Sequence, residues 1–485
     1  MKCASICLAS DSYGYGVSVA KKTKNNIGKR QKSMKIKRIL ALVLSLAMVM
    51  TMFAACGKKD DDNGNKNDPV TQDDKLAESG KVYMLNFKPE QDAAFKKAAD
   101  EFTKETGIEV KVETAASGEY ETTLKTRMTS KDAAPTLFTI NGPVGYNAWK
   151  EYCADLTAVE LAKMVTDQGF LVKDGDKVFG IANCVEGYGI IYNNSIIKKY
   201  CEMEGAKIKD VSEITSFDTL KAVVEDMDAK KADLGIDAVF ASTTLEASDN
   251  WRWVTHLNNM PLWLQFDKDG TTGTVDTFSF DFADSFKNIF DLYLNYDIKA
   301  ERDKTTDDTM VQLATGRCVF AQNGTWAWGT ISGTEGNVVK AEDCGFLPIY
   351  TGTNDDKTGI CAGTENFFSV NAKATKEDQA ATVKFLNWLY TSETGMNIVK
   401  NDLQFIAPFN NFKAEKSTNP LINALADATA AGKVTPWKFH VIPSENFKKA
   451  FGANLKGYAE GTVEWSTVVE DYSADWEEQM ILINK

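Results

Sequence analysis

Histidine, metal-binding spacings and catalytic signatures are all scarce in this chain of 485 residues. It has two histidines, His256 and His440, and none of its nine cysteines stands in C-x-x-C spacing. A zinc site is therefore not expected. The motifs G-x-S-x-G, H-E-x-x-H and G-x-x-x-x-G-K-[ST] are also missing. We predict a protein that is not an enzyme and uses no cofactor, although a glycoside hydrolase stays open because its two carboxylates need no local signature.

Positive charge is in short supply as well. Residues 1–55 hold ten basic residues and one acidic residue, so the rest of the chain carries 45 Lys and Arg against 67 Asp and Glu. Phosphate backbones are bound by clustered Lys and Arg, and the acidic body therefore argues against a nucleic-acid partner. At 43% hydrophobic residues, a chain of this length can bury large cores and is expected to form two or more lobes.

Six of the nine cysteines lie in the body of the chain. An even number permits disulfides outside the cytoplasm, but a chain of this size does not depend on them. We predict mostly free, buried thiols, with a Cys344–Cys361 bridge as the alternative. The six are Cys153, Cys184, Cys201, Cys318, Cys344 and Cys361.

An apolar run extends from Ile39 to Ala55. It follows a basic segment that starts at Met34, and it ends in small residues. This is the layout of a secretory signal. The run is at or just below the ~17–25 residues that span a bilayer, so a permanent transmembrane helix is the weaker alternative.

The end of this run, Phe53-Ala54-Ala55-Cys56, resembles the lipobox of bacterial lipoproteins, in which the cysteine receives a diacylglycerol and becomes the new N-terminus. An ordinary signal peptide with an incidental cysteine is the alternative. Residues 56–80 are charged and rich in turn formers, which predicts a disordered tether. We interpret 34–55 as the lipoprotein signal peptide and 1–33 as an extension from an upstream start codon.

The pattern after residue 80 alternates between strands and helices. Gly107 ends the first helix, in which Phe95, Ala98, Ala99 and Phe102 recur at helical spacing. The order β-α-β-α-β predicts a parallel sheet covered by helices, with ligands at the carboxyl ends of its strands. The expected strands are 81–87, 108–114 and 134–140, and the expected helices are 90–107 and 118–130.

Further along the chain, residues 183–190 are interpreted as a crossing between two lobes. A second α/β region follows, with a helix in residues 216–229 capped by Ser216 or Asp218, and a hairpin is expected around Gly270. A strand and then a strong helix are expected within residues 361–399, and the helix should turn Val383, Leu386 and Leu389 inward.

Four strings, "FKKAADEFTKETGIEVKVE", "VFGIANCVEGYGIIYNN", "GRCVFAQNGTWAWG" and "FLNWLYTSETG", occur in the order typical of a known family. They resemble the extracellular solute-binding proteins, family 1, of ABC carbohydrate importers, which include maltose-binding protein. The resemblance covers nearly all of residues 81–485. It implies an α/β fold of the two-lobed periplasmic-binding-protein type (type II), with each lobe a sheet flanked by helices and a multi-strand hinge between them. It also implies discontinuous lobes, 81–186 with 365–405 and 187–364 with 406–485.

The resemblance implies a function too. The protein would capture an oligosaccharide between its lobes and deliver it to the transmembrane subunits of an ABC permease. It would act as a monomer, anchored through Cys56 at the outer face of the bacterial cytoplasmic membrane. A binder of another solute on the same fold is the alternative.

Sugars present flat C–H faces ringed by hydroxyls, so their binders need aromatic planes with polar side chains at the edges. Trp326 follows Asn323-Gly324 and matches the family string "NG-x-W", whose tryptophan stacks on a sugar ring; core packing is the alternative. Trp251 and Trp253 point to different faces of a helix, and we expect Trp251 at the cleft. Trp263 is a further candidate, for which core packing is equally open.

The remaining candidates lie at strand ends and crossings. Each has a structural alternative, either a hinge role, a satisfied turn or simple solvation. They are Asn141 and Tyr146 after a strand, Glu119 early in a helix, Glu186 and Tyr188 at the first crossing, and Glu365 and Asn366 after the second.

Overall fold

The computed structural model describes residues 69–70, 72–115, 119–130, 134–247, 249–413 and 416–483. The chain divides into two units, 1–65 and 66–485, and every described residue belongs to the second. The predicted signal peptide, the lipid-anchor residue Cys56 and the start of the predicted tether therefore lie outside the described residues.

The first sheet has six strands in the order β2-β1-β3-β11-β5-β4. Strands β1, β2 and β3 run parallel, as the sequence predicts, whereas β11 pairs antiparallel with both β3 and β5. All five residues of β1 are buried, as expected for a strand covered on both faces. The strands are β1 Val82–Asn86, β2 Val110–Thr114, β3 Leu137–Asn141, β4 Leu171–Asp174, β5 Lys177–Ala182 and β11 Asn366–Val370.

Helices cover both faces of this sheet. Met84 of β1 packs in one core with Phe102 of α3 and Leu386 of α14. Leu85, the next residue, packs in another core with Leu124 of α4. This alternation follows from the period of two along a strand. The helices are α2 Asp74–Ala77, α3 Asp92–Thr106, α4 Tyr120–Met128, α5 Gly142–Trp149, α6 Glu160–Met164, α14 Lys376–Thr391 and α15 Glu393–Asn401.

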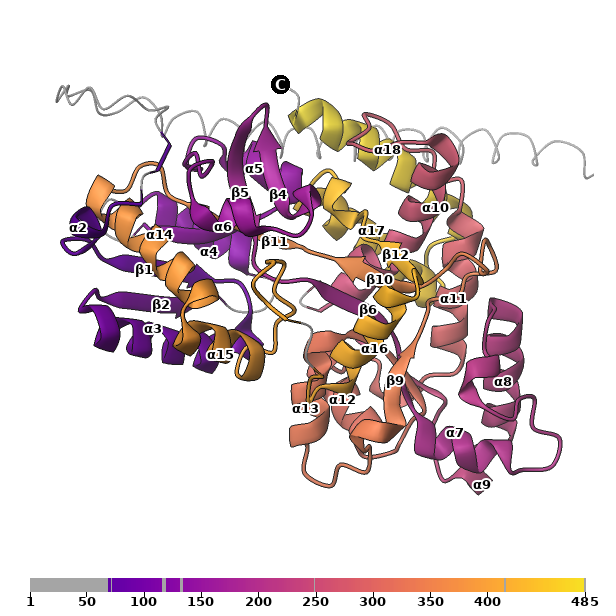
Figure 1. Cartoon of the computed structure of the whole chain (residues 1–485). Coiled ribbons are helices and arrows are strands. Elements are labelled where there is room, and N and C mark those ends of the chain that lie inside the picture. Colours follow the sequence, from indigo (N-terminus) through magenta and orange to yellow (C-terminus); the bar gives the residue numbers. More distant parts are fainter. Residues whose placement is uncertain are drawn as a thin grey trace, which may run out of the picture. The chain divides into compact units, whose positions relative to one another are not determined.

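Segments far apart in the sequence meet in this lobe. Figure 1 shows the orange helices α14 and α15 beside the indigo helices α2 and α3. The inward positions predicted for Val383, Leu386 and Leu389 are confirmed, because all three are fully buried.

The predicted tether is wrong at its C-terminal end. Asp73 caps α2, and Val70 and Ala77 are buried in the core of the first lobe. The amide of Val70 also donates to the carbonyl of Asp155. These few apolar residues give the segment a docking surface on α14, which its polar composition concealed.

The second sheet has the order β12-β10-β6-β8-β7, and β9 also pairs with β6. Strand β6 is its centre, because it pairs antiparallel with β10, β8 and β9. The strands are β6 Glu186–Asn193, β7 Phe240–Ala241, β8 Phe320–Gly324, β9 Cys344–Leu347, β10 Ile360–Gly363 and β12 Val434–Pro436.

The second lobe is mainly helical around this sheet. Its largest core is aromatic and joins Trp253, Phe286 and Tyr472. Ser216 caps α8, as predicted. The helices are α7 Asn194–Cys201, α8 Phe217–Ala229, α9 Lys231–Leu234, the π-helix η4 Arg252–Leu257, α10 Asn259–Asp269, α11 Ala283–Asn295, α12 Thr306–Ala314, α13 Trp328–Gly333, α16 Pro420–Ala430, α17 Glu445–Ala459 and α18 Trp465–Ile483.

Two crossings join the sheets. The chain passes from β5 to β6 through residues 183–185 and returns from β10 to β11 through residues 364–365. Pairing of Glu186 with Gly363 places the two crossings side by side. The residue limits of the lobes stay a prediction. Phe409 and Phe412 pack in the first-lobe core, which favours an end of the first lobe later than the predicted residue 405.

Two further expectations can be compared with the structure. The hairpin around Gly270 is wrong: α10 runs to Asp269, Gly270 caps it at φ 64°, and no strand occurs among residues 266–281. All six body cysteines are free, so the Cys344–Cys361 alternative is not realised.

Within the described part of the chain, no helix is both long and apolar enough to cross a bilayer. The same residues contain no group of three His, Cys, Asp or Glu side chains arranged to hold a metal ion.

Substitution Gly189→Ala should destabilise the second lobe. A Cβ atom at Gly189 would lie 2.5 Å from the carbonyl oxygen of Leu347, which belongs to the paired strand β9. We expect a loss of about 1–3 kcal/mol from this overpacking, measured as a lower midpoint of thermal unfolding. In the control Gly329→Ala, in α13, the added Cβ meets no atom within 4 Å. Equal midpoints for the two variants would contradict the packing.

Candidate functional site

A cluster of aromatic rings lies along η4 and beyond the ends of β8 and β12. The ring centroids of Trp326 and Trp251 are 6.3 Å apart, and that of His256 is 5.5 Å from Trp326. His256 stacks on Tyr188 at 4.2 Å. Trp326 and Trp251 are partly exposed, whereas Tyr188, His256 and Trp437 are buried. The two tryptophans therefore form the accessible surface of a buried aromatic stack.

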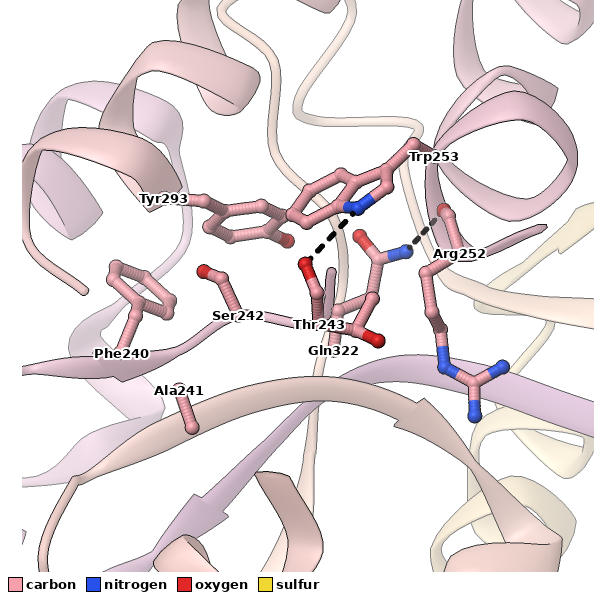
Figure 2. A pocket seen from close by; sticks show the side chains of 8 residues that line it. All are labelled: Phe240, Ala241, Ser242, Thr243, Arg252, Trp253, Tyr293 and Gln322. Carbon is pink, nitrogen blue, oxygen red and sulfur yellow. Dashed lines mark hydrogen bonds between the residues drawn. The ribbon is translucent and has the colours of Figure 1, made fainter. Parts of the chain in front are cut away.

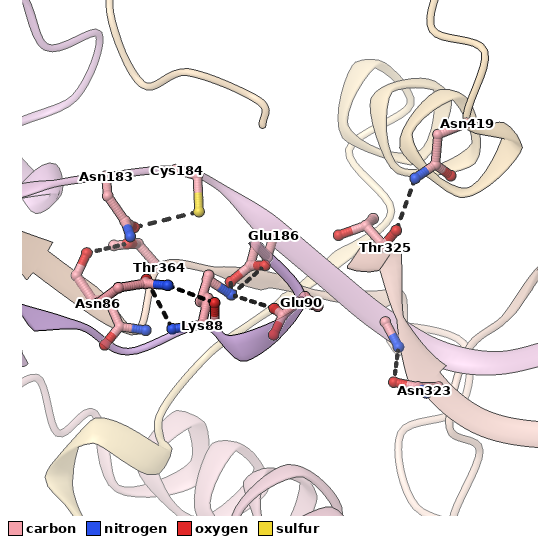
Figure 3. A network of polar contacts seen from close by, with 12 residues as sticks. Asn86, Lys88, Glu90, Asn183, Cys184, Glu186, Asn323, Thr325, Thr364 and Asn419 are labelled. Atoms are coloured by element: carbon pink, nitrogen blue, oxygen red, sulfur yellow. Dashed lines mark hydrogen bonds and ion pairs between the residues drawn. The ribbon is translucent and has the colours of Figure 1, made fainter. Parts of the chain in front are cut away.

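The turn that carries Trp326 explains its Asn-Gly-x-Trp pattern. A Cβ atom at Gly324 would lie 2.2 Å from Cη2 of Trp326, so the indole ring lies directly against the glycine. Asn419, the N-cap of α16, donates to the carbonyl of Thr325 at 2.8 Å. Figure 3 shows this contact beside Asn323. The glycine and the amide together hold the tryptophan in place.

Arg252 lies under the tryptophan pair. Its guanidinium carbon is 3.3 Å from the centroid of Trp251 and 5.6 Å from that of Trp326. Nη2 donates to Oδ1 of Asn323, while Nε and Nη1 have no partner among the described atoms. Burial lowers the pKa of Arg252 to about 9, against the opposing effect of nearby carboxylates. The side chain therefore keeps two free donors in a desolvated position.

A small pocket lies beside Arg252, and its lining includes Thr243, Trp253, Tyr293 and Gln322. Figure 2 shows Trp253 and Gln322 across this pocket and the guanidinium of Arg252 extending away from them. The hydroxyl of Tyr293 and Oε1 of Gln322, both from residues that line the pocket, lack partners among the described residues.

A buried ion pair joins the first lobe to the hinge. Nζ of Lys88, just after β1, is 2.8 Å from Oε1 of Glu186, the first residue of β6, and both side chains are less than a tenth exposed. Figure 3 shows Lys88 between Glu186 and Glu90. Burial alone lowers the pKa of Lys88, but the carboxylates of Glu186 and Glu90 outweigh it and the pKa is raised. The ammonium also lies 5.6 Å from the ring of Trp326.

A second polar group borders the hinge. Asn141, at the end of β3, donates to Glu365 at 3.5 Å. Lys448 of α17 pairs with Glu445 at 2.8 Å and interacts electrostatically with Glu365. Burial raises the pKa of Glu365 despite the two nearby lysines, Lys448 and Lys88. Residues of both lobes therefore contribute to one polar rim.

Glu121 and Trp149 extend this rim in the first lobe. The indole Nε1 of Trp149 donates to Oε2 of Glu121 at 3.0 Å. Glu121 is exposed, yet desolvation raises its pKa. Its charge interactions with Glu445 and Lys448 connect Glu121 electrostatically to this rim.

Several predicted residues lie together here. Trp326, Asn323, Trp251 and Glu186 belong to the cluster around Arg252 and Lys88, and Asn141 and Glu365 contact each other on the rim. Trp253, the neighbour expected in the core, is buried there.

Other candidates are placed differently. Tyr188 is fully buried and donates to the carbonyl of His256. Trp263 is packed in the aromatic core. For these two we favour the structural alternative, because a ligand reaches neither ring without rearrangement of the core.

The last three candidates lie around the first sheet. Tyr146 stacks on Phe179 and donates to Asp174. Asn366 is buried, and its Nδ2 has no partner among the described atoms. Glu119 is exposed and precedes α4. Their role in binding stays a prediction.

Three neighbours of the site escaped the sequence reasoning: Arg252, His256 and Lys88. Arg252 stands between Trp251 and Trp253, and a charged residue inside an apolar helical stretch was the signal available for it. Lys88 carries no local signal, since its partner Glu186 is 98 residues away in the sequence.

The model of a protein family described as bacterial extracellular solute-binding proteins matches residues 97–426. The chain belongs to this family. No curated protein matches its sequence.

Solved structures of solute-binding proteins share this fold at low sequence identity. A family 1 extracellular solute-binding protein from Bifidobacterium longum subsp. infantis is 16% identical, with a TM-score of 0.57 over 82% of this chain and 99% of that one. A sugar transporter from Bacillus licheniformis, in complex with stachyose, is 18% identical, with a TM-score of 0.61 over 82% and 100%. The GacH receptor of Streptomyces glaucescens, solved unliganded and with acarbose, is 16% identical, with a TM-score of 0.62 over 83% and 99%.

Substitution Lys88→Met should destabilise this solute-binding protein strongly. It leaves the carboxylate of Glu186 buried without its cation, which costs about 3–5 kcal/mol. The double variant Lys88→Met/Glu186→Leu removes both charges and should lose less. Urea unfolding of the wild type, the two single variants and the double variant measures the coupling. Losses that simply add would contradict a coupled pair.

Proposed function

We propose that this protein is the substrate-binding lipoprotein of an ABC importer, which captures an oligosaccharide in a cleft between its lobes. The observation that carries the proposal is the partly exposed pair Trp251 and Trp326 above a buried aromatic stack. Two flat indole faces at the lobe junction suit the C–H faces of sugar rings.

The polar groups around this pair support a hydroxylated ligand. Arg252 has two donors without partners and Asn141 has an acceptor, Oδ1, without one. Buried polar groups normally find partners. A sugar, whose hydroxyls donate and accept, satisfies both kinds of group at once.

The solved relatives add support from fold. Structures that share this fold include complexes with raffinose, stachyose and acarbose. Each of these ligands is named for those proteins, and we extend the class to this chain because its tryptophan pair offers the matching surface.

The remaining parts of the proposal concern place and partner. Cys56 would hold the protein at the outer face of the cytoplasmic membrane, and closure of the lobes, with the limits predicted above, would present the loaded protein, a monomer, to permease subunits. Closure brings the groups of both lobes onto the ligand simultaneously. The chain would carry out no chemistry on the sugar.

Substitution Trp326→Ala should weaken binding of the tightest oligosaccharide in a screen by at least about 30-fold, or 2 kcal/mol, because a central aromatic contact is lost. Gly324→Ala should weaken it as well, since the added Cβ displaces the ring of Trp326. Isothermal titration calorimetry measures both.

The matched control is Trp388→Ala. Trp388 is also partly exposed but lies on α14, where its Nε1 donates to Glu105. The variant Trp388→Ala should leave the affinity for the oligosaccharide unchanged. Trp326→Ala with wild-type affinity would remove Trp326 from the site.

The bound oligosaccharide should also stay intact. Long incubation with the protein, followed by chromatography of the sugar, is expected to return the original chain length. Shortened products would favour the glycoside hydrolase alternative. Binding of peptides or small polyols in place of oligosaccharides would favour a different solute on the same fold.

A further inference from the structure

Carboxylates from both lobes act electrostatically on the buried guanidinium of Arg252. Asp249 and Asp307 belong to the second lobe, Glu90 follows β1 in the first, and Glu365 lies at the second crossing. All four interact electrostatically with Arg252. The single positive charge of Arg252 therefore interacts with four carboxylates.

Lys88 does not neutralise this excess of negative charge. Its ammonium is paired with Glu186 at 2.8 Å and lies 3.7 Å from Glu90. Lys448, which faces Glu365, is already paired with Glu445. Five carboxylates thus interact with Lys88 or Arg252, namely those of Glu90, Glu186, Asp249, Asp307 and Glu365.

These charges lie close to the proposed ligand surface. Asp249 accepts from Nε1 of Trp251 at 3.0 Å, and it also accepts from the amide of Thr306 at the start of α12. Asp307 is the next residue. The two cations, Lys88 and Arg252, are each 5.6 Å from the ring of Trp326.

Glu90 and Asp307 stand on different lobes and are both solvent-exposed. Glu90 and Asp307 interact electrostatically. The pKa of Asp307 is raised mainly by desolvation, and the charges of Asp249 and Glu90 raise it further. Bringing a further anion between these carboxylates would cost energy in a partly desolvated site, whereas a neutral group or an ammonium would meet no such cost.

We propose that the site selects its ligand by charge: the sugar unit held at Trp251 and Trp326 carries no carboxylate or sulfate and is a neutral or amino sugar, with Glu90 and Asp307 as the specificity-determining residues. This inference rests on the proposed function. Four carboxylates act electrostatically on Arg252, and we assign its free Nε and Nη1 to hydroxyl or ring oxygens of the sugar.

The test uses matched ligands in isothermal titration calorimetry at low salt. The tightest neutral oligosaccharide of a screen is compared with its analogue in which one hexose is replaced by the corresponding uronic acid. The uronate should bind at least about tenfold more weakly, equivalent to about 1.4 kcal/mol. The ratio should shrink in high salt, since exposed charges are screened.

The double variant Glu90→Gln/Asp307→Asn should reduce that ratio by at least about threefold. Its control, Glu109→Gln/Asp284→Asn, makes the same change in net charge at exposed positions. Glu109 precedes β2, so it lies at the opposite edge of the parallel strands from Glu90, which follows β1. The control should leave the ratio unchanged.

Three outcomes decide between the accounts. Weaker binding of the uronate, relieved by the double variant alone, supports charge selection. Uronates that bind as tightly as the neutral sugar overturn charge selection and leave sugar binding standing. Failure of every neutral, amino and acidic oligosaccharide to bind overturns the proposed function and charge selection with it.

Discussion

The pairing of β6 with β10 is the constraint on which the rest of the structure depends. Strand β6 follows the first crossing and β10 precedes the second, and their register places Glu186 opposite Gly363. This ladder belongs to the second sheet, and it holds the two chain connections to the first sheet side by side. Lys88 reaches the same point from the end of β1, and its buried ion pair with Glu186 ties the first sheet to the first residue of the hinge strand.

The site follows from this junction. Strand β6 pairs with β8 along its length, so the turn after β8 that carries Trp326 lies next to the hinge. The π-helix η4 adds Trp251 and Arg252, and Gly363 leaves room for the ring of Trp437, because a Cβ there would lie 2.7 Å from Cγ of that ring. Aromatic planes and buried charges therefore meet at a place fixed by backbone pairing, which suits a binding surface that must be formed before the ligand arrives.

Much of the fold could be predicted from local patterns. Strand alternation and the helical spacing of Phe95, Ala98 and Phe102 report burial directly, and the parallel first strands follow from their order. Trp326 was proposed from the family string Asn-Gly-x-Trp, and the structure gives this string a local reason, a glycine against the indole. Arg252 and Lys88 were not found, because their significance depends on partners far away in the sequence. The two wrong predictions have the same cause. The polar segment of α2 packs against α14, which is far away in the sequence. Gly270 caps helix α10, although a glycine at this position also suits a hairpin turn.

The most direct measurement is a thermal-shift screen of the purified protein against oligosaccharides of different linkages, with peptides and small polyols beside them. A ligand that binds only the folded state raises the unfolding midpoint by mass action. The account predicts a clear rise with one class of oligosaccharide and none with peptides or polyols. A rise with peptides or polyols alone would contradict it.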